Sequence, residues 1–266
     1  SGVSLVNMKG KDFNSLVGSV NFSSMKLVNN LKEINFNPVF INQKINFNNR
    51  EFRIDNNDLI QAKIEGSFKN EDIIPLIKNT FFKVYEISPL NTVLDKQFLS
   101  FEVKVYDKPL KALYPNITFG SNIRLIGNLS SENIKSKIKI QLPLFNYNDF
   151  VFKDLVYDLD FNKSNKKSQL KISELNHKLY KINNLKLSSL SLNKGVLFES
   201  NFQGNEGDDI YDFKLLKIND DDNNQSIIHK ESRITHRNSL WELESNPDKK
   251  IIQFDNNLKK ILINNL

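Results

Sequence analysis

Four oxygen-bearing side chains near residue 220 have a spacing that could hold a cation. Asp220, Asp222 and Asn224 alternate, and Glu231 lies eleven residues after Asp220. This spacing resembles a calcium-binding EF-hand loop, in which carboxylate and amide oxygens coordinate the ion. The position that requires the sharp-turn glycine holds Gln225, and the flanking segments alternate like strands. A long polar hairpin turn is the preferred interpretation, and no metal site is predicted.

The residue types that usually carry catalysis are not arranged for it. His177, His229 and His236 lie in polar surroundings, with no HExxH helix to present them to a metal. No serine sits in a Gly-x-Ser-x-Gly turn, and the nine glycines form no phosphate-binding loop. The absence of cysteine excludes disulfides, thiolate catalysis and cysteine metal sites. We therefore predict no enzymatic activity and no cofactor. A carbohydrate-active β-sandwich enzyme is the least favoured alternative, because the sequence has no convincing carboxylate pair.

Composition excludes two further classes of function. The 37 basic and 31 acidic residues give a net charge of +6, and the basic ones are spread along the chain, so no nucleic-acid partner is predicted. No apolar run approaches the roughly 20 residues that span a bilayer. The chain opens at Ser1 without an initiator Met and ends within an apolar pattern. We expect residues 1–266 to be a single continuous segment of a longer protein.

Any binding site must be built on strands, because one pattern recurs between Phe98 and Phe202. Short stretches alternate apolar and polar residues and are separated by polar turns. Successive side chains of a strand point to opposite faces, so each stretch has one apolar and one wet face. Evenly spaced strands of this kind predict an all-β architecture. Further short strands are predicted towards the N-terminus, including one at 36–40.

The apolar period changes from two to about four in one segment. Ile73, Ile77 and Phe81 recur every four residues, which predicts a helix at about 71–83. A second helical turn is predicted at 109–114 (PLKALY). These helices either form a lid or plug on the apolar sheet face or simply cover a local core, and the second interpretation is preferred.

The predicted sheet leaves open what covers its apolar face. Such a face must meet a second sheet, a partner or a lipid. A closed β-sandwich of 266 residues would have a radius of gyration of about 18 Å. A dozen or more strands stacked about 4.8 Å apart would instead extend some 50–60 Å or more.

Several segments resemble the TamB proteins of Bacteroidetes-type bacteria, which are AsmA-like bridge-type lipid transporters. The resemblance covers nearly the whole chain from about Leu16 and is one of pattern and phrase, since that family has no invariant catalytic motif. The family's Gly-containing phrase is replaced by Ile227-Ile228-His229 here. The segments that carry it are 71–85 (EDIIPLIKNTFFKVY), 98–107 (FLSFEVKVYD), 114–129 (YPNITFGSNIRLIGNL), 196–204 (VLFESNFQG) and 249–257 (KKIIQFDNN).

The resemblance implies an elongated, U-shaped antiparallel β-sheet, the β-taco groove, with one or two short helices. It implies a periplasmic protein that is anchored in the inner membrane by regions outside this segment and that reaches the outer membrane. The groove would let phospholipid acyl chains slide, and an Omp85-type barrel protein, TamA or BamA-like, would be a partner in outer-membrane biogenesis.

Two hypotheses of different class follow. The first is a segment of a lipid-conducting groove, and the second is a scaffolding β-domain with a closed core that assists outer-membrane protein assembly. In the first, apolar side chains of one face would solvate acyl chains, at about 0.8 kcal/mol per buried CH₂. The predicted groove-lining residues are Leu99, Phe101, Val103, Val105, Ile123, Leu125, Ile138, Ile140, Leu142, Tyr157, Leu159, Phe161, Val196, Phe198 and Phe202.

Overall fold

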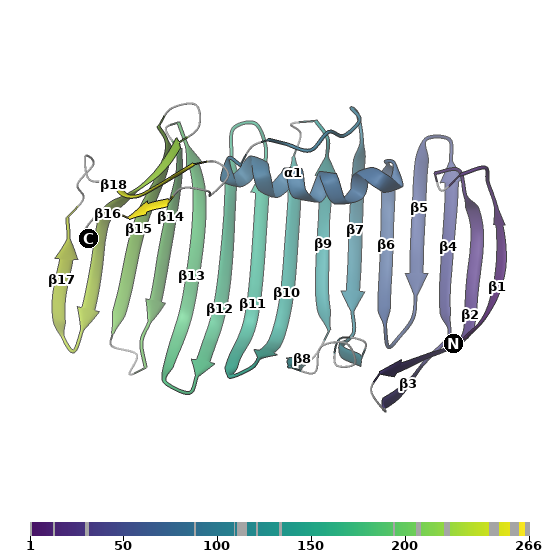
Figure 1. Ribbon diagram of the computed structural model, residues 1–266, viewed down its shortest axis with the longest axis horizontal. Helices are drawn as coiled ribbons and strands as arrows, with labels where there is room; N and C mark the ends of the chain where they lie inside the picture. Colours follow the sequence, from purple (N-terminus) through teal and green to yellow (C-terminus); the bar gives the residue numbers. More distant parts are fainter. Residues whose placement is uncertain are drawn as a thin grey trace.

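The protein is a single antiparallel sheet of 19 strands with one helix across it (Figure 1). The computed structural model describes residues 2–12, 14–29, 32–87, 89–108, 110, 116–120, 122–132, 135–193, 195–205, 209–220, 224–244, 250–255 and 261–263. The strands are β1 (Gly2–Lys9), β2 (Val17–Asn29), β3 (Lys32–Phe36), β4 (Val39–Asn46), β5 (Asn49–Asp55), β6 (Ile60–Ser67), β7 (Phe98–Val105), β8 (Ile117–Phe119), β9 (Ile123–Ser130), β10 (Ser136–Tyr147), β11 (Phe150–Phe161), β12 (Lys166–His177), β13 (Tyr180–Leu192), β14 (Gly195–Gln203), β15 (Ile210–Asn219), β16 (Asn224–His236), β17 (Ser239–Leu243), β18 (Lys250–Asp255) and β19 (Ile261–Ile263).

The sheet is long because its strands follow one another as a meander. From β9 to β17 every strand pairs with the next one in the chain, and all pairs are antiparallel. At three positions in the sheet, two strands share the same neighbouring strand: β3 and β4, β8 and β9, and β17 and β18. At about 4.8 Å per strand position the described sheet is roughly 70 Å long. The prediction of an all-β, elongated antiparallel sheet is confirmed, although the sheet is neither closed nor strongly curled.

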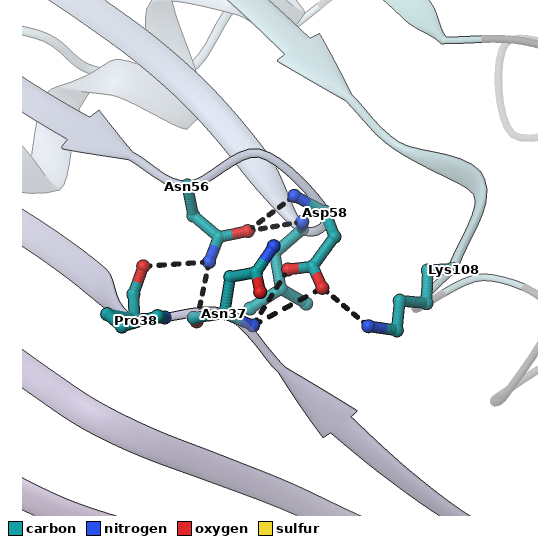
Figure 2. A network of polar contacts seen from close by, with 6 residues as sticks. Asn37, Pro38, Asn56, Asp58 and Lys108 are labelled. Carbon is teal, nitrogen blue, oxygen red and sulfur yellow. Dashed lines mark hydrogen bonds and ion pairs between the residues drawn. The ribbon is translucent and has the colours of Figure 1, made fainter.

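The predicted strand at 36–40 is wrong, because β3 ends at Phe36 and β4 begins at Val39. Pro38 has no N–H to donate to a sheet ladder, so the pairing is interrupted there. Figure 2 shows what holds the break: the Asn56 side chain donates to the carbonyls of Asn37 (2.8 Å) and Pro38 (3.0 Å). Its amide oxygen accepts from the backbone N–H of Asp58 at 2.8 Å. The β5–β6 turn therefore supports the β3–β4 break.

Asp58 links the same network to the segment that follows β7. Its carboxylate accepts from the backbone N–H of Asn37 and pairs with Lys108 Nζ at 2.5 Å (Figure 2). Lys108 lies 50 residues further along the chain. Three separate connections are thus held together at one end of the sheet.

Asn56→Ala is expected to lower the free energy of unfolding by about 1–3 kcal/mol, because Asn56 is buried and its loss leaves polar groups without partners. Asn57→Ala, at the exposed neighbouring position, should change stability by less than about 0.5 kcal/mol. Urea unfolding followed by circular dichroism measures both. Equal losses in the two variants would show that the network in Figure 2 does not stabilise the fold.

The helix lies across one face of the sheet, perpendicular to the strands (Figure 1). A 3₁₀ turn, η1 (Asn70–Asp72), leads into α1 (Ile73–Tyr85), so the helix predicted at 71–83 is confirmed within two residues. Of the turn predicted at 109–114, Leu110 is helical and the other positions lie outside the described residues. In the part of the chain that the structure describes, no helix has the length and apolar character needed to cross a membrane.

A line of irregular positions crosses the middle of four neighbouring strands. The register between β10 and β11 skips Pro143 and Asp154, and that between β12 and β13 skips Ser173 and Asn184. Asp154 and Asn184 have φ values of 50° and 53°. Asp and Asn tolerate this left-handed conformation better than other non-glycine residues. We call this line the crease.

Aromatic rings stack in rows between the crease and the turns that follow β10 and β12. Phe145 of β10 stacks on Phe119 of β8 (5.2 Å between centroids) and on Phe152 of β11 (5.3 Å). Phe150 stacks on His177 of β12 at 4.6 Å. These contacts join neighbouring strands of the sheet and contribute to their pairing.

Candidate functional site: an apolar strip beside the helix

The strand register places all fifteen predicted groove residues on one face of the sheet. Leu99, Phe101, Val103 and Val105 of β7 stand opposite Leu129, Gly127, Leu125 and Ile123 of β9. The same face continues through β10 and β11, where Ile138 pairs with Leu159 and Ile140 with Tyr157. It continues to β14, where Val196, Phe198 and Phe202 alternate. The face that carries these residues is also the face that α1 covers.

The helix turns part of this face into a closed core. Leu76 and Val84 of α1 are 1% and 0% exposed and pack in one cluster with Leu99, Leu129 and Leu159. Five of the fifteen predicted residues are therefore buried rather than open to a ligand: Leu99, Ile138, Leu159, Phe161 and Val196. The helix acts as a cover of local core, as the preferred interpretation of the sequence had it.

Polar contacts fasten the N-terminal end of the helix and the segment that follows it. Gln97 Nε2 donates to Asp72 Oδ2 at 2.5 Å, and the backbone N–H of Lys69 donates to Gln97 Oε1 at 2.6 Å. Asn79 exchanges two hydrogen bonds with the backbone of Asn91, at 2.7 and 2.8 Å. Because these partners are buried or half-buried, releasing α1 would leave several polar groups unsatisfied.

Lys217 of β15 holds the C-terminal end of the helix. Its Nζ donates to the carbonyl oxygens of Tyr85 (3.0 Å) and Glu86 (3.3 Å), which have no partner within the helix. A cation at the C-terminal end of a helix also interacts favourably with the helix dipole. Burial lowers the pKa of Lys217, and the nearby Glu86 carboxylate opposes that shift. Ser191 donates to the same carboxylate at 2.6 Å.

A row of hydroxyl groups forms the boundary beside this helix end. Tyr85 Oη lies 3.0 Å from Tyr157 Oη and 2.7 Å from Ser168 Oγ, which in turn lies 2.8 Å from Ser189 Oγ. Burial raises the pKa of Tyr157, and the hydrogen bond between Tyr157 and Tyr85 raises it further. The phenol is therefore neutral in any physiological condition. The hydroxyl groups of this row are therefore hydrogen-bonded to one another across α1, β11, β12 and β13.

The remaining ten predicted residues form the candidate site, which we call the apolar strip. Each is half-buried, and the helix covers part of the strip, because Tyr157 stacks on Phe81 and Phe198 stacks on Tyr85 of α1. Sequence reasoning missed Leu187 and Leu215, which are exposed on the same face, although alternation in 180–192 and 210–219 signalled them. The strip consists of Phe101, Val103, Val105, Ile123, Leu125, Ile140, Leu142, Tyr157, Phe198 and Phe202.

The strip ends in a second aromatic stack near β17. Phe202 of β14 stacks on Tyr211 of β15 at 4.7 Å, and Tyr211 stacks on Phe213 at 6.5 Å. Ile234, the cross-strand partner of Tyr211, pairs in turn with Trp241 of the edge strand. The apolar surface thus reaches the edge of the sheet.

The opposite face is charged and polar. Cross-strand ion pairs join Lys137 to Asp160 at 3.2 Å and Arg124 to Glu102 at 2.8 Å. A shallow depression of about 840 Å³ on this face is lined by lysine, aspartate, serine and asparagine side chains as well as a few apolar ones. The sheet therefore separates an apolar surface from a wet one.

The residues with possible cation or catalytic chemistry are not assembled into a site. Asp220 Oδ1 pairs with Lys250 at 2.8 Å, and Ser226 donates to the other carboxylate oxygen. Asp222 lies outside the described residues, and Asn224 begins β16. Within the described ranges, no three His, Asp or Glu side chains could together hold a metal ion.

The three histidines have separate structural roles. His177 stacks between Phe150 and Tyr180, and His229 Nε2 lies 2.9 Å from Ser232 Oγ. His236 Nδ1 lies 2.8 Å from Asp209 Oδ2 and thereby ties the β16–β17 turn to the β14–β15 connection. The Ser232 hydroxyl beside His229 is buried and also donates to the backbone carbonyl of Lys230, so it makes a structural contact within β16.

Glu174 of β12 makes the stability of the lower half of the sheet depend on pH. Hydrogen bonds from Lys153, Lys181 and Asn176 lower its pKa from 4.5 to about 2. A lowered folded-state pKa gives a contribution that is complete above pH 4.5 and lost as the pH falls towards 2. We expect Glu174→Gln to flatten the fall in unfolding temperature over this range. Parallel curves for the two proteins would contradict this account.

Comparisons of the chain with protein-family models, with curated protein sequences and with solved structures find no match.

Proposed function

We propose that this chain is a segment of a TamB-like conduit that carries phospholipid acyl chains on its apolar strip. The observation that supports the proposal most is the division of one elongated sheet into a half-buried apolar strip and a charged opposite face. Acyl chains are the common biological ligand that needs a long apolar surface and no specific polar partner. The charged face would keep the assembly in water.

The dimensions of the strip fit such a ligand. It runs from β7 to β14, which is about 30 Å at the spacing of strands. Since the hydrocarbon core of a bilayer is about 30 Å thick, one acyl chain covers about half of that length. A lipid could therefore move along the strip while most of its methylene groups stay against Val, Leu, Ile and Phe side chains.

In this proposal α1 limits the part of the sheet face on which lipid can move. α1 and the polar row at its C-terminal end close the part of the face above the strip, so acyl chains would pass below the helix in the view of Figure 1. The conduit would work between the inner and outer membranes of a Gram-negative envelope, with an Omp85-type barrel as partner. Membrane anchoring would come from regions outside this segment.

A second candidate function is a scaffold in the assembly of outer-membrane proteins. Two edge strands of the sheet favour it, because Val3, Leu5 and Val6 of β1 and Leu240 and Trp241 of β17 are exposed. Open sheet edges with apolar side chains accept additional strands. If the chain is a scaffold, its edge strands bind protein and no lipid binds on the apolar strip.

Lipid extraction separates the two functions. The chain is purified without detergent from cells that contain phospholipid, and its bound molecules are measured by native mass spectrometry and by solvent extraction. The conduit predicts phospholipid that co-purifies and is replaced by a fluorescent phospholipid added in vitro. A folded chain that carries no lipid and takes up no probe would contradict the conduit and favour the scaffold.

A further inference from the structure

An open pocket of about 350 Å³ lies near the N-terminal end of α1, away from the apolar strip. Its walls come from the β4–β5 hairpin, from the end of β6 with the residues that follow it, and from residues 94–97, which lead into β7. The β4–β5 turn and the start of β7 lie at the upper edge of the sheet in Figure 1. Three segments far apart in the sequence therefore meet at this pocket.

Hydrogen bonds of Gln97 hold one wall of the pocket in place. The buried Gln97 side chain accepts from the backbone N–H of Lys69 at 2.6 Å and donates to Asp72 at 2.5 Å. The backbone N–H of Gln97 donates to Ser131 Oγ at 3.0 Å. The wall on the other side is the β4–β5 ladder. Both walls belong to hydrogen-bonded segments, so the pocket is formed before any ligand enters it, as binding pockets usually are.

Arg50 of β5 brings a positive charge to this pocket. Its guanidinium lies 6.0 Å from the centre of the Phe68 ring, and it makes no ion pair and no hydrogen bond with any residue that the structure describes. Its Nη1 atom is buried, so water does not reach this nitrogen either. A charged group without a partner is costly where water is excluded. An anion in the pocket would offset that cost.

The carboxylates that interact with Arg50 at longer range are held by other groups. The hydrogen bond from Ser15 is the main cause that lowers the pKa of Asp12, and the hydrogen bond from Asn14 is the main cause that lowers the pKa of Glu71. Arg50 is the weakest cause of both shifts. Arg50 is therefore available to an anionic ligand.

The charge of the pocket wall favours a phosphate monoester over a carboxylate. Lys69 and Lys96 also line the pocket, and neither forms an ion pair within the described ranges. With Arg50 and the carboxylate of Asp95, the described wall has a charge of +2. A phosphate monoester carries about −1.5 to −2 at pH 7. Its three terminal oxygens can also accept more of the Arg and Lys hydrogens than the two oxygens of a carboxylate can.

The pocket has an apolar side that includes a phenylalanine in an unfavourable conformation. Phe47 is the first residue of the two-residue β4–β5 turn, has a φ of 54° and is completely exposed. Glycine is the usual residue at such a turn position, because a bulky side chain is strained there. Ile45, Phe68 and Leu94 add apolar surface to the wall. A ligand with an apolar group would remove part of this surface from water.

We propose that this pocket binds a phosphate monoester that carries an apolar group. The phosphate lies among the side chains of Arg50, Lys69 and Lys96, and the apolar group lies against Phe47 and Leu94. Such a monoester is either a soluble molecule or a lipid with a terminal phosphate, and the test below distinguishes these sources. The proposal does not rest on the conduit, because the apolar strip begins at β7 and lines none of this pocket.

Isothermal titration calorimetry of the whole chain at pH 7 tests the proposal. The titrants are hexyl phosphate, inorganic phosphate, hexanol and dihexanoyl phosphatidic acid below the concentration at which it forms micelles. Hexyl phosphate is expected to bind at least tenfold more tightly than inorganic phosphate or hexanol, because it uses both sides of the pocket. Tighter binding of the phosphatidic acid than of hexyl phosphate would assign the site to a lipid, and the reverse order would assign it to a soluble ester.

Two variants and a matched control locate the binding. Arg50→Gln should lower the affinity for hexyl phosphate at least tenfold. Arg53→Gln, on the other face of the same strand and paired with Glu51 at 3.1 Å, should change it less than about twofold. Phe47→Gly should weaken the binding of hexyl phosphate but not that of inorganic phosphate. Its unfolding temperature should not fall, since glycine adopts a φ of 54° without strain.

Three results would overturn the proposal. The first is a folded chain that shows no saturable binding of hexyl phosphate. The second is equal weakening by Arg50→Gln and Arg53→Gln, and if Arg50→Gln does not fold, an unchanged affinity in Phe47→Gly has the same meaning. The third is inorganic phosphate that binds as tightly as hexyl phosphate. None of these results changes what lipid extraction says about the apolar strip, so the pocket and the conduit can fail separately.

Discussion

Val84→Asp is expected to lower the free energy of unfolding by more than about 4 kcal/mol. Val84 is fully buried where α1 packs on the sheet. The buried residues of its cluster are apolar, so they offer a new carboxylate no partner. An unpaired buried charge is among the most destabilising single changes. For a chain of this size the midpoint of thermal unfolding should fall by about 10 °C or more, as measured by circular dichroism.

Ile74→Asp provides the matched control on the same helix. Ile74 is 58% exposed, and an acidic residue in the first turn of a helix is favourable. The change should alter stability by less than about 0.5 kcal/mol. If the two variants lose the same stability, α1 is not a cover of the core.

Val103→Asp is expected to lower phospholipid binding at least tenfold while the chain stays folded. Val103 is half-buried on the apolar strip, where an acyl chain would have to pass beside the new charge. Placing a charge against hydrocarbon costs several kcal/mol, and 1.4 kcal/mol already corresponds to a factor of ten. Ile140→Asp, on β10 and two strand positions away from Val103 along the same strip, should act in the same way. Titration with a fluorescent phospholipid measures the affinity.

Lys104→Asp and Lys139→Asp test the same charge on the opposite face. Their side chains point away from the strip, and Lys139 makes only a 3.8 Å contact with Asp158. Each should change lipid affinity less than about twofold, since surface ion pairs contribute little. Equal effects on both faces in folded proteins would contradict the conduit. If the strip variants unfold instead, the strip is part of a closed core and the scaffold is favoured.

Much of the architecture could be predicted because its determinants are local. Alternation along each strand depends only on neighbouring residues, and it correctly placed Leu99 to Val105 and Val196 to Phe202 on a common face. The helix was equally local, since Ile73, Ile77 and Phe81 repeat at its period. A meander also needs no long-range pairing, so the order of strands follows the order of the chain.

The parts that escaped prediction depend on contacts between distant residues. Which groove residues α1 buries is decided by where the helix lies, and Lys217, 131 residues after Glu86, fixes that position. The crease escaped prediction because alternation does not mark a residue such as Asp154, which adopts a left-handed conformation within β11. Pro38 carried a signal that the predicted strand at 36–40 ignored.

Site-specific photocrosslinking tests the central claim most directly. A photoreactive amino acid is placed at 103, 125 or 142 on the apolar strip, or at 104, 124 or 139 on the charged face, in cells that make labelled phospholipid. The account predicts lipid adducts at the three strip positions and background levels at the three others. Adducts at equal levels on both faces, or none at any position in a folded protein, would contradict it.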